Sequence, residues 1–413
     1  MGRKPHVILV PYPAQGHVKV TFVNTESIHA KLMYVMLEKF KEKIPISLVS
    51  VPEGLESNHD GKDSFQAIES GSSFIQITLV IADISVGWAL EVAGKMGIQR
   101  AAFVPNGVGN LAMIRHNPML IEAGIIDDYG IPMKDEFICL SNEIPAWNTN
   151  ELVWSFTGDR EVQKLIFKHF ICNIVENVQI SNWLLVNSSY ELEPSACDLI
   201  PNILPIGSLP MSDPLGSFAR NFWPEDSTCL SWLDEHPPGS VIYATFGSST
   251  ICNKQQFNEL ALGLETLGQP FLWVVQFLQM ECLVGKYGKI VEWAPQEKVL
   301  AHPSTACFFT HCGWNSTMKG LNMGVPFLCW PYCADQFHNR SYICETWKVG
   351  LGLIPDDNSI VNRHEIKTKL EKLVSDKDIK ANSLKLKEMA RKSTSEGGSS
   401  FKNFIRFVEQ INL

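Results

Sequence analysis

Short runs of apolar, β-branched residues recur along the chain, and segments with helical spacing of apolar positions separate several of them. In the first half these runs predict buried strands at HVILV (6–10), KVTFVN (19–24), ISLVSV (46–51), ITLVIA (77–82), RAAFV (100–104) and NWLLVN (182–187). The segment WALEVAGKMG (88–97) is typical of the intervening helices. Strands alternating with helices predict a parallel sheet with helices on both faces, so the fold class is α/β.

The alternation stops at a proline-rich segment and then restarts. PNILPIGSLPMSDPLGSF (201–218) has the composition of a linker. After it, strands are predicted at SVIYATFGS (240–248), FLWVVQ (271–276), GKIVEW (288–293), ACFFTH (306–311), PFLCWP (326–331) and VGLGLI (349–354). We therefore predict two α/β domains joined near residues 205–225.

The predicted domain bounds follow from this break. They are an N-terminal domain at 1–205, a linker at 206–225, a second domain at 226–395 and a C-terminal helix at 396–413. Four apolar residues of that helix have the i, i+3, i+4, i+7 spacing of one face: Phe401, Phe404, Ile405 and Val408. We expect this helix to pack back on the N-terminal domain.

The first βαβ unit is too short for the pattern. Only residues 11–19 lie between the run HVILV and the core of the next apolar run. A parallel crossover normally takes about a dozen residues or more and usually includes a helix. We therefore expect this unit to lack its helix, so that either the second run pairs differently or the sheet is rearranged.

Composition narrows the class of protein. A length of 413 residues favours two domains, and the formal charge of −9 argues against a nucleic-acid surface. The N-terminal apolar run is too short for a signal peptide, and no apolar stretch reaches the length of a membrane span. The sequence thus predicts a cytoplasmic protein, and no feature indicates a protein partner.

The eleven cysteines form no CxxC pair and no repeated spacing, which is typical of reduced thiols. Cys329 and Cys333 lack a matching His or Cys pair, so we expect no metal site. The segment GVGNLA (107–112) has the outline of a dinucleotide fingerprint. It is not in the first strand–helix turn and no strand follows it at the right distance, so a helix start packed on the sheet is favoured.

The segment THCGWNSTMKG (310–320) is a stronger candidate for an anion-binding site than the segment 107–112. A strand, a glycine turn and a helix that begins at Asn315 or Ser316 follow one another, and a helix start binds anions. Asn315, Ser316 and Lys319 share one face of this helix. The alternative is an ordinary asparagine N-cap with a solvated lysine.

Two further segments end strands of the same predicted sheet. WAPQ (293–296) follows one strand, and Asp335–Gln336 follows another. The carboxyl ends of parallel strands can converge on one cleft. An aromatic face, a helix start and an acid–amide pair suit a base, a phosphate and a sugar.

From Trp293 to Gln336 the chain resembles the signature box of plant secondary-product UDP-glycosyltransferases, through WAPQ, HP, THCGWNS, GVPFLCWPY and ADQ. The resemblance extends to PYPAQGHV, VIAD, GWALEVA, YATFGS and EGGSSFKNF. It implies the GT-B fold, with two Rossmann-like domains facing across a cleft. It also implies inverting sugar transfer from a UDP-sugar, with no cofactor, to a small hydroxylated plant metabolite.

The resemblance also implies roles for individual residues. The uracil and ribose would contact Trp293, the Ala294 backbone and Gln296. The diphosphate would be held by Ser248, His311, Asn315 and Ser316. The sugar would contact Asp335, Gln336 and Trp314, and a terminal Gln in the box is associated with UDP-glucose.

His17, in the loop after the first strand, matches the catalytic base of the family. An imidazole can take a proton from a hydroxyl at neutral pH. Asp83 matches the carboxylate that orients this imidazole, in the manner of a His–Asp pair. On its own, a histidine after a strand is more often structural.

Lys319 departs from the family, which has Glu at this position accepting hydrogen bonds from the ribose hydroxyls. Lysine has no acceptor, although its ammonium could reach the diphosphate. We expect a weakened donor site. Two interpretations stay open: a working glucosyltransferase, or a catalytically impaired relative with a shortened N-terminal half. Phe74, Trp154 and Phe156 either line an acceptor pocket or belong to the core.

Overall fold

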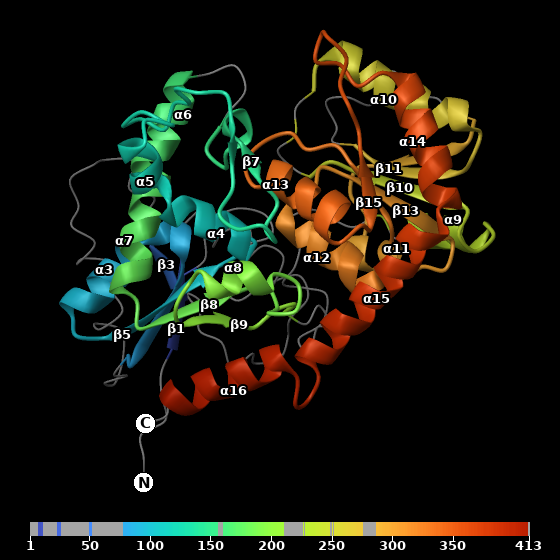
Figure 1. The fold of residues 1–413 in the computed structure, drawn as a ribbon. Helices are drawn as coiled ribbons and strands as arrows, with labels where there is room; N and C mark the ends of the chain where they lie inside the picture. Colours follow the sequence, from blue (N-terminus) through green and yellow to red (C-terminus); the bar gives the residue numbers. More distant parts are fainter. Residues whose placement is uncertain are drawn as a thin grey trace. The chain divides into compact units, whose positions relative to one another are not determined.

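The computed structural model describes residues 7–10, 23–25, 49–51, 77–155, 160–209, 226, 228–247, 250, 252–275 and 286–411. The chain divides into two compact units (Figure 1). Unit 1 consists of Met1–Met119, Glu161–Phe222 and Ser393–Leu413, and unit 2 of Leu120–Arg160 and Trp223–Lys392. The domain bounds inferred from the sequence stay a prediction.

Unit 1 contains a parallel five-stranded sheet in the order β1-β4-β5-β8-β9. Its strands are β1 (Val7–Val10), β4 (Leu79–Asp83), β5 (Gln99–Val104), β8 (Trp183–Val186) and β9 (Ile203–Pro205). Four of them match predicted apolar runs, and strands buried on both faces explain why those runs are continuous rather than alternating.

The second and third predicted runs lie elsewhere. β2 (Val23–Thr25) and β3 (Val49–Val51) pair in parallel as a separate two-stranded sheet. β1 pairs instead with β4, with Val7 opposite Leu79. Of the two alternatives left by the short first unit, the described residues therefore show the one in which the second run pairs differently.

Helices pack on the sheet of unit 1. They are α3 (Trp88–Lys95), α4 (Val108–Arg115), α7 (Cys172–Ile180), α8 (Pro194–Asp198) and α16 (Ser399–Ile411), with α6 (Arg160–Ile166), the 3₁₀ turn η1 (Ile84–Val86) and the π turn η3 (Phe167–Ile171). α3 matches its predicted segment and buries Leu90 and Val92. Asn177 of α7 donates to the Ile84 carbonyl at 3.0 Å, which joins α7 to the end of β4.

The C-terminal helix α16 packs on β9 through only part of the predicted face. Phe404 and Ile405 are 46% and 37% exposed, whereas Phe407 is 3% exposed and meets the Trp183 ring edge-on at 5.5 Å. Asn403 donates to the Pro205 carbonyl at 2.9 Å, which fixes the helix rotation. Val408 of the predicted face packs against the same core, whereas Phe404 and Ile405 are exposed, so the prediction of the apolar face is only partly confirmed.

Unit 2 contains a parallel six-stranded sheet in the order β12-β11-β10-β13-β14-β15. Its strands are β10 (Val241–Thr245), β11 (Phe271–Val274), β12 (Gly288–Val291), β13 (Thr305–Thr310), β14 (Phe327–Cys329) and β15 (Gly350–Gly352), each inside a predicted run or within one residue of it. The helices are α5 (Asn117–Glu122, at the unit boundary), α9 (Thr228–Asp234), α10 (Lys254–Leu267), α11 (Gln296–Ala301), α12 (Trp314–Met323), α13 (Gln336–Ser341), α14 (Arg363–Ser375) and α15 (Lys377–Thr394). The π turn η6 (Tyr342–Thr346) directly follows α13.

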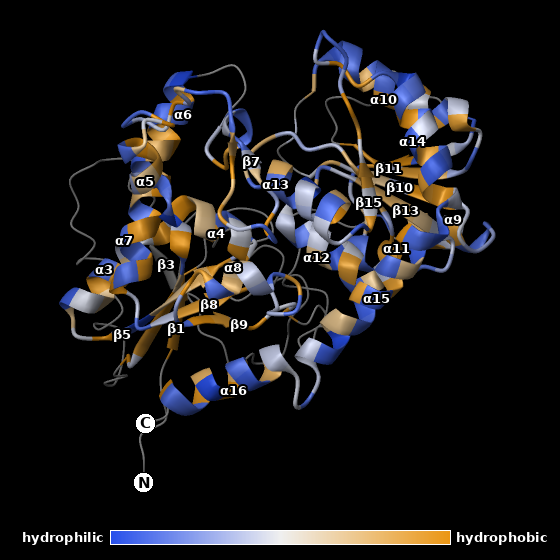
Figure 2. Cartoon of the chain, viewed as in Figure 1, coloured by the Kyte–Doolittle hydropathy of each residue, from blue (hydrophilic) through white to orange (hydrophobic). Residues whose placement is uncertain are grey.

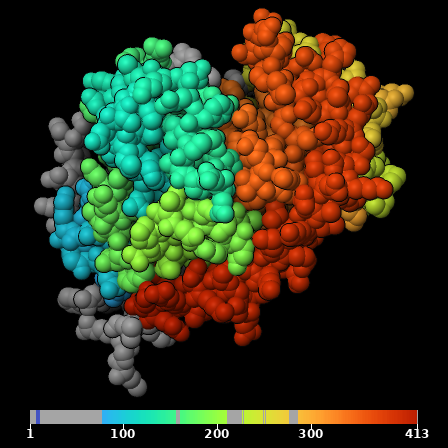
Figure 3. All heavy atoms as spheres, in the orientation of Figure 1, coloured from blue at the N-terminus to red at the C-terminus, as the bar shows by residue number. Residues whose placement is uncertain are grey.

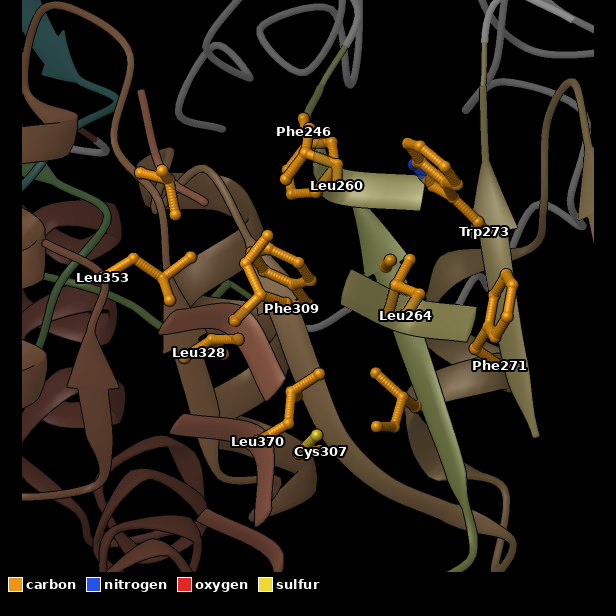
Figure 4. Packing of buried hydrophobic residues seen from close by; sticks show 14 of the residues in the cluster. Phe246, Leu260, Leu264, Phe271, Trp273, Cys307, Phe309, Leu328, Leu353 and Leu370 are labelled. Carbon is orange, nitrogen blue, oxygen red and sulfur yellow. The ribbon is translucent and has the colours of Figure 1, made fainter. Parts of the chain in front are cut away.

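One face of this sheet forms a core with α10 and α14 (Figure 4). Leu260, Leu264 and Leu370 of the helices pack against Phe309 and Trp273 of the strands. Each fully buried side chain of this size contributes about 1.5–3 kcal/mol. Hydrophilic residues predominate on the exposed sides of α14 and α15 (Figure 2), which lie on the molecular surface (Figure 3).

A hairpin from the first half of the sequence also belongs to unit 2. β6 (Phe137–Ile138) pairs antiparallel with β7 (Trp147–Asn148), and the 3₁₀ turn η2 (Thr149–Glu151) follows. Nearby, Trp154 is fully buried and donates to the Gly130 carbonyl at 2.9 Å, so it is a core residue. Phe74 and Phe156 lie outside the described residues. No helix in the described ranges is long and apolar enough to cross a membrane.

The glycine-rich segment 107–112 starts α4, as the favoured interpretation requires. The backbone N–H groups of Val108 and Gly109 donate to the two carboxylate oxygens of Glu193 at 3.0 and 2.9 Å. Ser188 donates to the same carboxylate at 2.5 Å. A protein carboxylate thus occupies the helix start where a dinucleotide would place its phosphates.

We expect Glu193→Gln to destabilise unit 1 by about 1–3 kcal/mol, because an amide N–H would then face a buried backbone donor. Burial raises the pKa of Glu193, while the hydrogen bonds from Gly109, Ser188 and Val108 oppose that shift. Urea unfolding measures the loss, with Glu122→Gln on the exposed end of α5 as the control. Equal stability of the two variants would contradict the capping role.

Candidate functional site

Three segments at one edge of the unit 2 sheet carry the predicted donor residues. Trp293 follows β12, His311 follows β13 and Asp335 follows β14. All six strands are parallel, so their carboxyl ends lie at the same edge, where open α/β sheets bind ligands. Side-chain hydrogen bonds join the segments to one another.

The turn between β13 and α12 is tightly held. Cys312 has a φ of 66°, and its N–H donates to Thr310 Oγ1 at 3.3 Å. The helix begins at Trp314 with Gly313 at the N-cap, slightly before the predicted start at Asn315 or Ser316. The alternative interpretation, an ordinary asparagine N-cap, is therefore wrong. Asn315 and Ser316 lie in the first turn, and a glycine cap has no side chain to cover the helix start.

His311 lies between two glycines at this turn. A Cβ atom on Gly247 or on Gly313 would come within 2.7 or 2.6 Å of His311 Nε2, so only glycine admits the ring here. Gly247 also has a φ of 77°. Nδ1 of His311 is buried and has no hydrogen-bond partner among the described residues.

The protonation of His311 follows from these surroundings. Burial lowers the pKa of His311 to about 4, and a hydrogen bond with the Thr245 backbone opposes this only in part. The imidazole is therefore neutral at pH 7. One ring nitrogen carries a proton and can donate a hydrogen bond, the other can accept one, and the tautomer decides which is which. It can offer an N–H to an anion without carrying a charge beforehand.

The first and second segments meet through Gln296, the first residue of α11. Its Nε2 donates to Ser316 Oγ on α12 at 3.3 Å. Trp293 is partly exposed just before α11, and its carbonyl accepts from the Asp226 N–H at 2.9 Å. Ala294 is 6% exposed. An accessible indole beside a polar helix start can stack on a planar ring.

The second and third segments meet through Asn339, to which sequence reasoning assigned no role. Its Nδ2 lies 2.9 Å from the Cys312 carbonyl and 2.9 Å from Asp335 Oδ2. Gln336 is 6% exposed, and its Oε1 accepts from the backbone N–H groups of Tyr332 and Cys333 at 2.8 and 3.1 Å. The i, i+4 spacing of Asp335 and Asn339 was the available signal.

Lys319 of α12 forms an ion pair with a residue of α11. Its Nζ lies 3.8 Å from Glu297 Oε1 on α11, and the two side chains are 23% and 24% exposed. Glu297, next to Gln296, is the second contact that the sequence pattern missed. The ammonium group is thus partly neutralised by a carboxylate of unit 2.

Other predicted residues are placed as follows. Trp314 is 3% exposed and lies 6.3 Å from the Trp347 ring, so it packs in the interior of unit 2. His17 and Ser248 lie outside the described residues. Asp83 ends β4 in unit 1, is 3% exposed and accepts from the Ser85 N–H at 2.9 Å. The pairing of His17 with Asp83 stays a prediction.

The part of the chain that the structure describes contains no group of three or more His, Cys, Asp or Glu side chains that could hold a metal ion. Cys329 is buried, and burial raises its pKa well above the usual value. The chemistry present in the site is that of hydrogen-bond donors, an aromatic ring and a helix start, which suits an anionic nucleotide.

Comparisons with known proteins identify the family of the chain. The family model described as "UDP-glucoronosyl and UDP-glucosyl transferase" matches residues 167–396. UDP-glycosyltransferase 83A1 of Arabidopsis thaliana is 39% identical over 455 aligned positions, which cover 100% of this chain and 97% of that protein. The alignment is longer than the chain, so this relative has residues that the chain lacks.

Solved structures share the fold. UGT2 of Phytolacca americana, complexed with UDP-2fluoro-glucose and pterostilbene, has a TM-score of 0.79 at 25% identity and matches 99% of this chain and 100% of its own. Os79 of O. sativa, in complex with UDP, has a TM-score of 0.75 at 21% identity, with 98% and 100% covered. The chain therefore belongs to the plant UDP-glycosyltransferases, a family of transferase enzymes with the GT-B fold of two Rossmann-like domains.

Proposed function

We propose that this protein transfers glucose from UDP-glucose to a hydroxyl of a small plant metabolite, with inversion at the anomeric carbon. The observation that carries the donor half is the linkage of three segments around the start of α12, through Gln296–Ser316 and through Asn339 with Cys312 and Asp335. The UDP-2fluoro-glucose and pterostilbene complex of UGT2 supports a glucose donor and a small acceptor.

The donor binds along this edge in three parts. Uracil stacks on Trp293 beside the Ala294 backbone, and the ribose lies near Gln296. The diphosphate lies at the start of α12, where Ser248, His311, Asn315 and Ser316 hold it with the helix dipole. Asp335 and Gln336 hydrogen-bond the glucose hydroxyls, with Trp314 behind the turn. UDP-glucose is a co-substrate, and the proposal needs no further cofactor.

The transfer needs one proton acceptor and one leaving group. His17 takes the proton of the acceptor hydroxyl while its oxygen bonds to the anomeric carbon from the face opposite UDP. The bond between that carbon and the diphosphate oxygen breaks, and UDP leaves with the electron pair. Asp83 orients the imidazole and stabilises its protonated form. Donors at the α12 start stabilise the charge that develops on the diphosphate.

A second candidate function rests on Lys319. Its ammonium is paired with Glu297 where the resemblance implies an acceptor for the ribose hydroxyls. A catalytically impaired relative would bind the donor weakly and turn over slowly. In either case we propose a cytoplasmic protein.

Release of UDP from UDP-glucose, with a mixed panel of flavonoid, phenolic and terpenoid alcohols, tests the proposal. We expect acceptor-dependent UDP release and a β-linked product by NMR, since UDP-glucose is α-linked. A folded protein that binds UDP-glucose without turnover would favour the impaired relative. A folded protein that binds neither UDP nor UDP-glucose would overturn the donor assignment.

We also expect UDP-glucose binding to take up protons as the pH falls below 7. His311 is neutral in the free protein because its pKa is about 4. A bound diphosphate raises that pKa, so the complex holds more protons than the free protein between the two values, and affinity rises as pH falls. UDP-glucose does not titrate in this range, which isolates the protein group.

Titration calorimetry in buffers of different ionisation enthalpy counts these protons. We expect uptake to grow from pH 7 to pH 5 in the parent and to vanish in His311→Gln, which keeps an N–H donor but cannot titrate. Uptake that is equal in the parent and the variant would show that another group is responsible.

A further inference from the structure

Helix α13, which begins with Gln336 directly after Asp335, is contacted by the hairpin segment, defined here as residues 134–151. The Trp147 ring is stacked on the His338 ring, with centroids 3.7 Å apart and planes 15° apart. Glu151 Oε2 accepts from Arg340 Nη2 at 3.0 Å. β7 and α13 lie next to each other in unit 2 (Figure 1).

The two contacts restrain α13 in more than one direction. Successive residues of a helix are rotated by about 100°, so His338 and Arg340 project from widely separated sides of the axis. A stack on one side resists displacement, and an ion pair on the other resists rotation. The Glu151 and Arg340 side chains are only 32% and 27% exposed, so solvent screens this pair less than a pair on an open surface.

The hairpin segment is itself well ordered by hydrogen bonds. Thr149 is fully buried and donates to the Lys134 carbonyl at 2.8 Å. Asn150 donates to Asp135 Oδ1 at 3.1 Å, and Trp147 is paired with Ile138 across the hairpin. A segment fixed in this way can hold a helix in place rather than merely follow it.

The contacts on α13 continue to the sugar-binding pair. Asn339 lies between the two contacted residues, and its N–H donates to the Asp335 carbonyl at 3.0 Å. The Asn339 side chain bonds both Asp335 and the turn before α12. A rotation of α13 would therefore move Asp335 and Gln336 relative to the α12 start.

The His338 ring provides packing surface rather than hydrogen bonds. Both of its nitrogens are buried and have no partner among the described residues. Burial lowers the pKa of His338 well below its usual value, so the ring is neutral. Tyr342 meets it edge-on at 4.9 Å. A phenyl ring could fill the same place, which offers a conservative variant.

We propose that Trp147 and Glu151 are positioning residues that set the recognition of the donor sugar by Asp335 and Gln336, separately from recognition of the nucleotide. Both contacts fall on α13, whereas the proposed nucleotide residues that the structure describes lie on α11, α12 and the turns before them. This inference rests on the proposed function, in which Asp335 and Gln336 bind glucose. The hairpin segment comes from the first half of the sequence, so the proposal links that half to donor specificity.

The test compares the affinities of UDP-glucose and UDP in the full chain by titration calorimetry. We expect Trp147→Ala to weaken UDP-glucose binding roughly tenfold more than UDP binding, because a shift of about 1 Å in the sugar residues is costly. Trp147→Phe should recover most of the difference, and His338→Phe should leave both affinities near the parent values. In turnover, KM for UDP-glucose should rise more than kcat falls.

A charge exchange gives a second test that does not remove core packing. Glu151→Arg should raise the ratio of the dissociation constant of UDP-glucose to that of UDP. Adding Arg340→Glu should lower this ratio again. Equal weakening of UDP and UDP-glucose, or no change in either, would overturn the inference alone. A parent protein that binds neither ligand would overturn the proposed function, and the inference with it.

Discussion

We expect His17→Ala to lower kcat for glucose transfer by about 10²–10⁴-fold while the affinity for UDP-glucose stays unchanged. The reason is that the base and the donor-binding residues are proposed to lie on different units. The residues proposed to bind the donor fall within the residue range of unit 2, whereas the proposed His17–Asp83 pair falls within that of unit 1. UDP release measures the loss of turnover, and calorimetry measures UDP-glucose affinity on the same preparation. A variant with parental kcat would show that another group takes the proton.

Asp83→Asn is the matched control for the imidazole. An amide oxygen can still accept from the Ser85 N–H, so the end of β4 is preserved. In the proposed pairing, the variant lacks the charge that favours a protonated imidazole, so the base should hold its proton less tightly. The acid limb of the pH–kcat profile should then move to lower pH, with a lower plateau. A profile that only scales down would indicate that Asp83 does not act through His17.

The strands of both units were well predicted, because buried parallel strands are continuous apolar runs. The run ACFFTH became β13, and RAAFV became β5. Pairing was less predictable. β2 pairs with β3 rather than in the larger sheet, and a single sequence contains no signal for such a choice.

Polar anchors explain the errors in helix detail. The spacing of Phe404 and Ile405 predicted a buried face, yet Asn403 fixes α16 with Phe407 inward. At α12 the asparagine looked like a cap, but Gly313 takes that position. Apolar periodicity predicts that a helix exists, whereas its rotation depends on tertiary hydrogen bonds.

The candidate site was predictable as far as local motifs extend. The turn with His311 and the pair Asp335–Gln336 came from strand ends and from the family resemblance. The contacts of Glu297, Asn339 and Trp147 could not be predicted from local motifs. Each of them joins segments that only the fold brings together. Trp147 and His338 are far apart in the sequence, so no local pattern predicts that their rings stack.

The second large effect is expected at Lys319, in the variant that replaces Lys319 by Glu and Glu297 by Gln together. The family resemblance implies that a carboxylate at 319 accepts from both ribose hydroxyls. A net gain equal to one hydrogen bond to a charged group, about 1.5–3 kcal/mol, should make UDP-glucose bind about tenfold to a hundredfold more tightly. Calorimetry with UDP-glucose and with UDP measures the gain, which should appear for both.

The ion pair explains why the single change should gain less. In Lys319→Glu the new carboxylate faces Glu297, whose Oε1 is 3.8 Å from the ammonium it replaces. A carboxylate at position 319 and the Glu297 carboxylate repel each other, and the repulsion offsets part of the new ribose contact. Glu297→Gln alone removes the pair without supplying an acceptor, so any gain comes only from the released ammonium and should be smaller than that of the double variant. A double variant no tighter than Glu297→Gln would refute the ribose contact.

The same variant separates the two interpretations of the enzyme. If Lys319 limits a working transferase, tighter donor binding lowers KM for UDP-glucose at unchanged kcat, because ribose contacts are the same in the ground and transition states. If the shortened first unit limits catalysis, KM falls and turnover stays negligible at saturating donor. The loss would then lie with the positioning of His17, and restoring the donor site would convert a weak binder into a tight but inactive one.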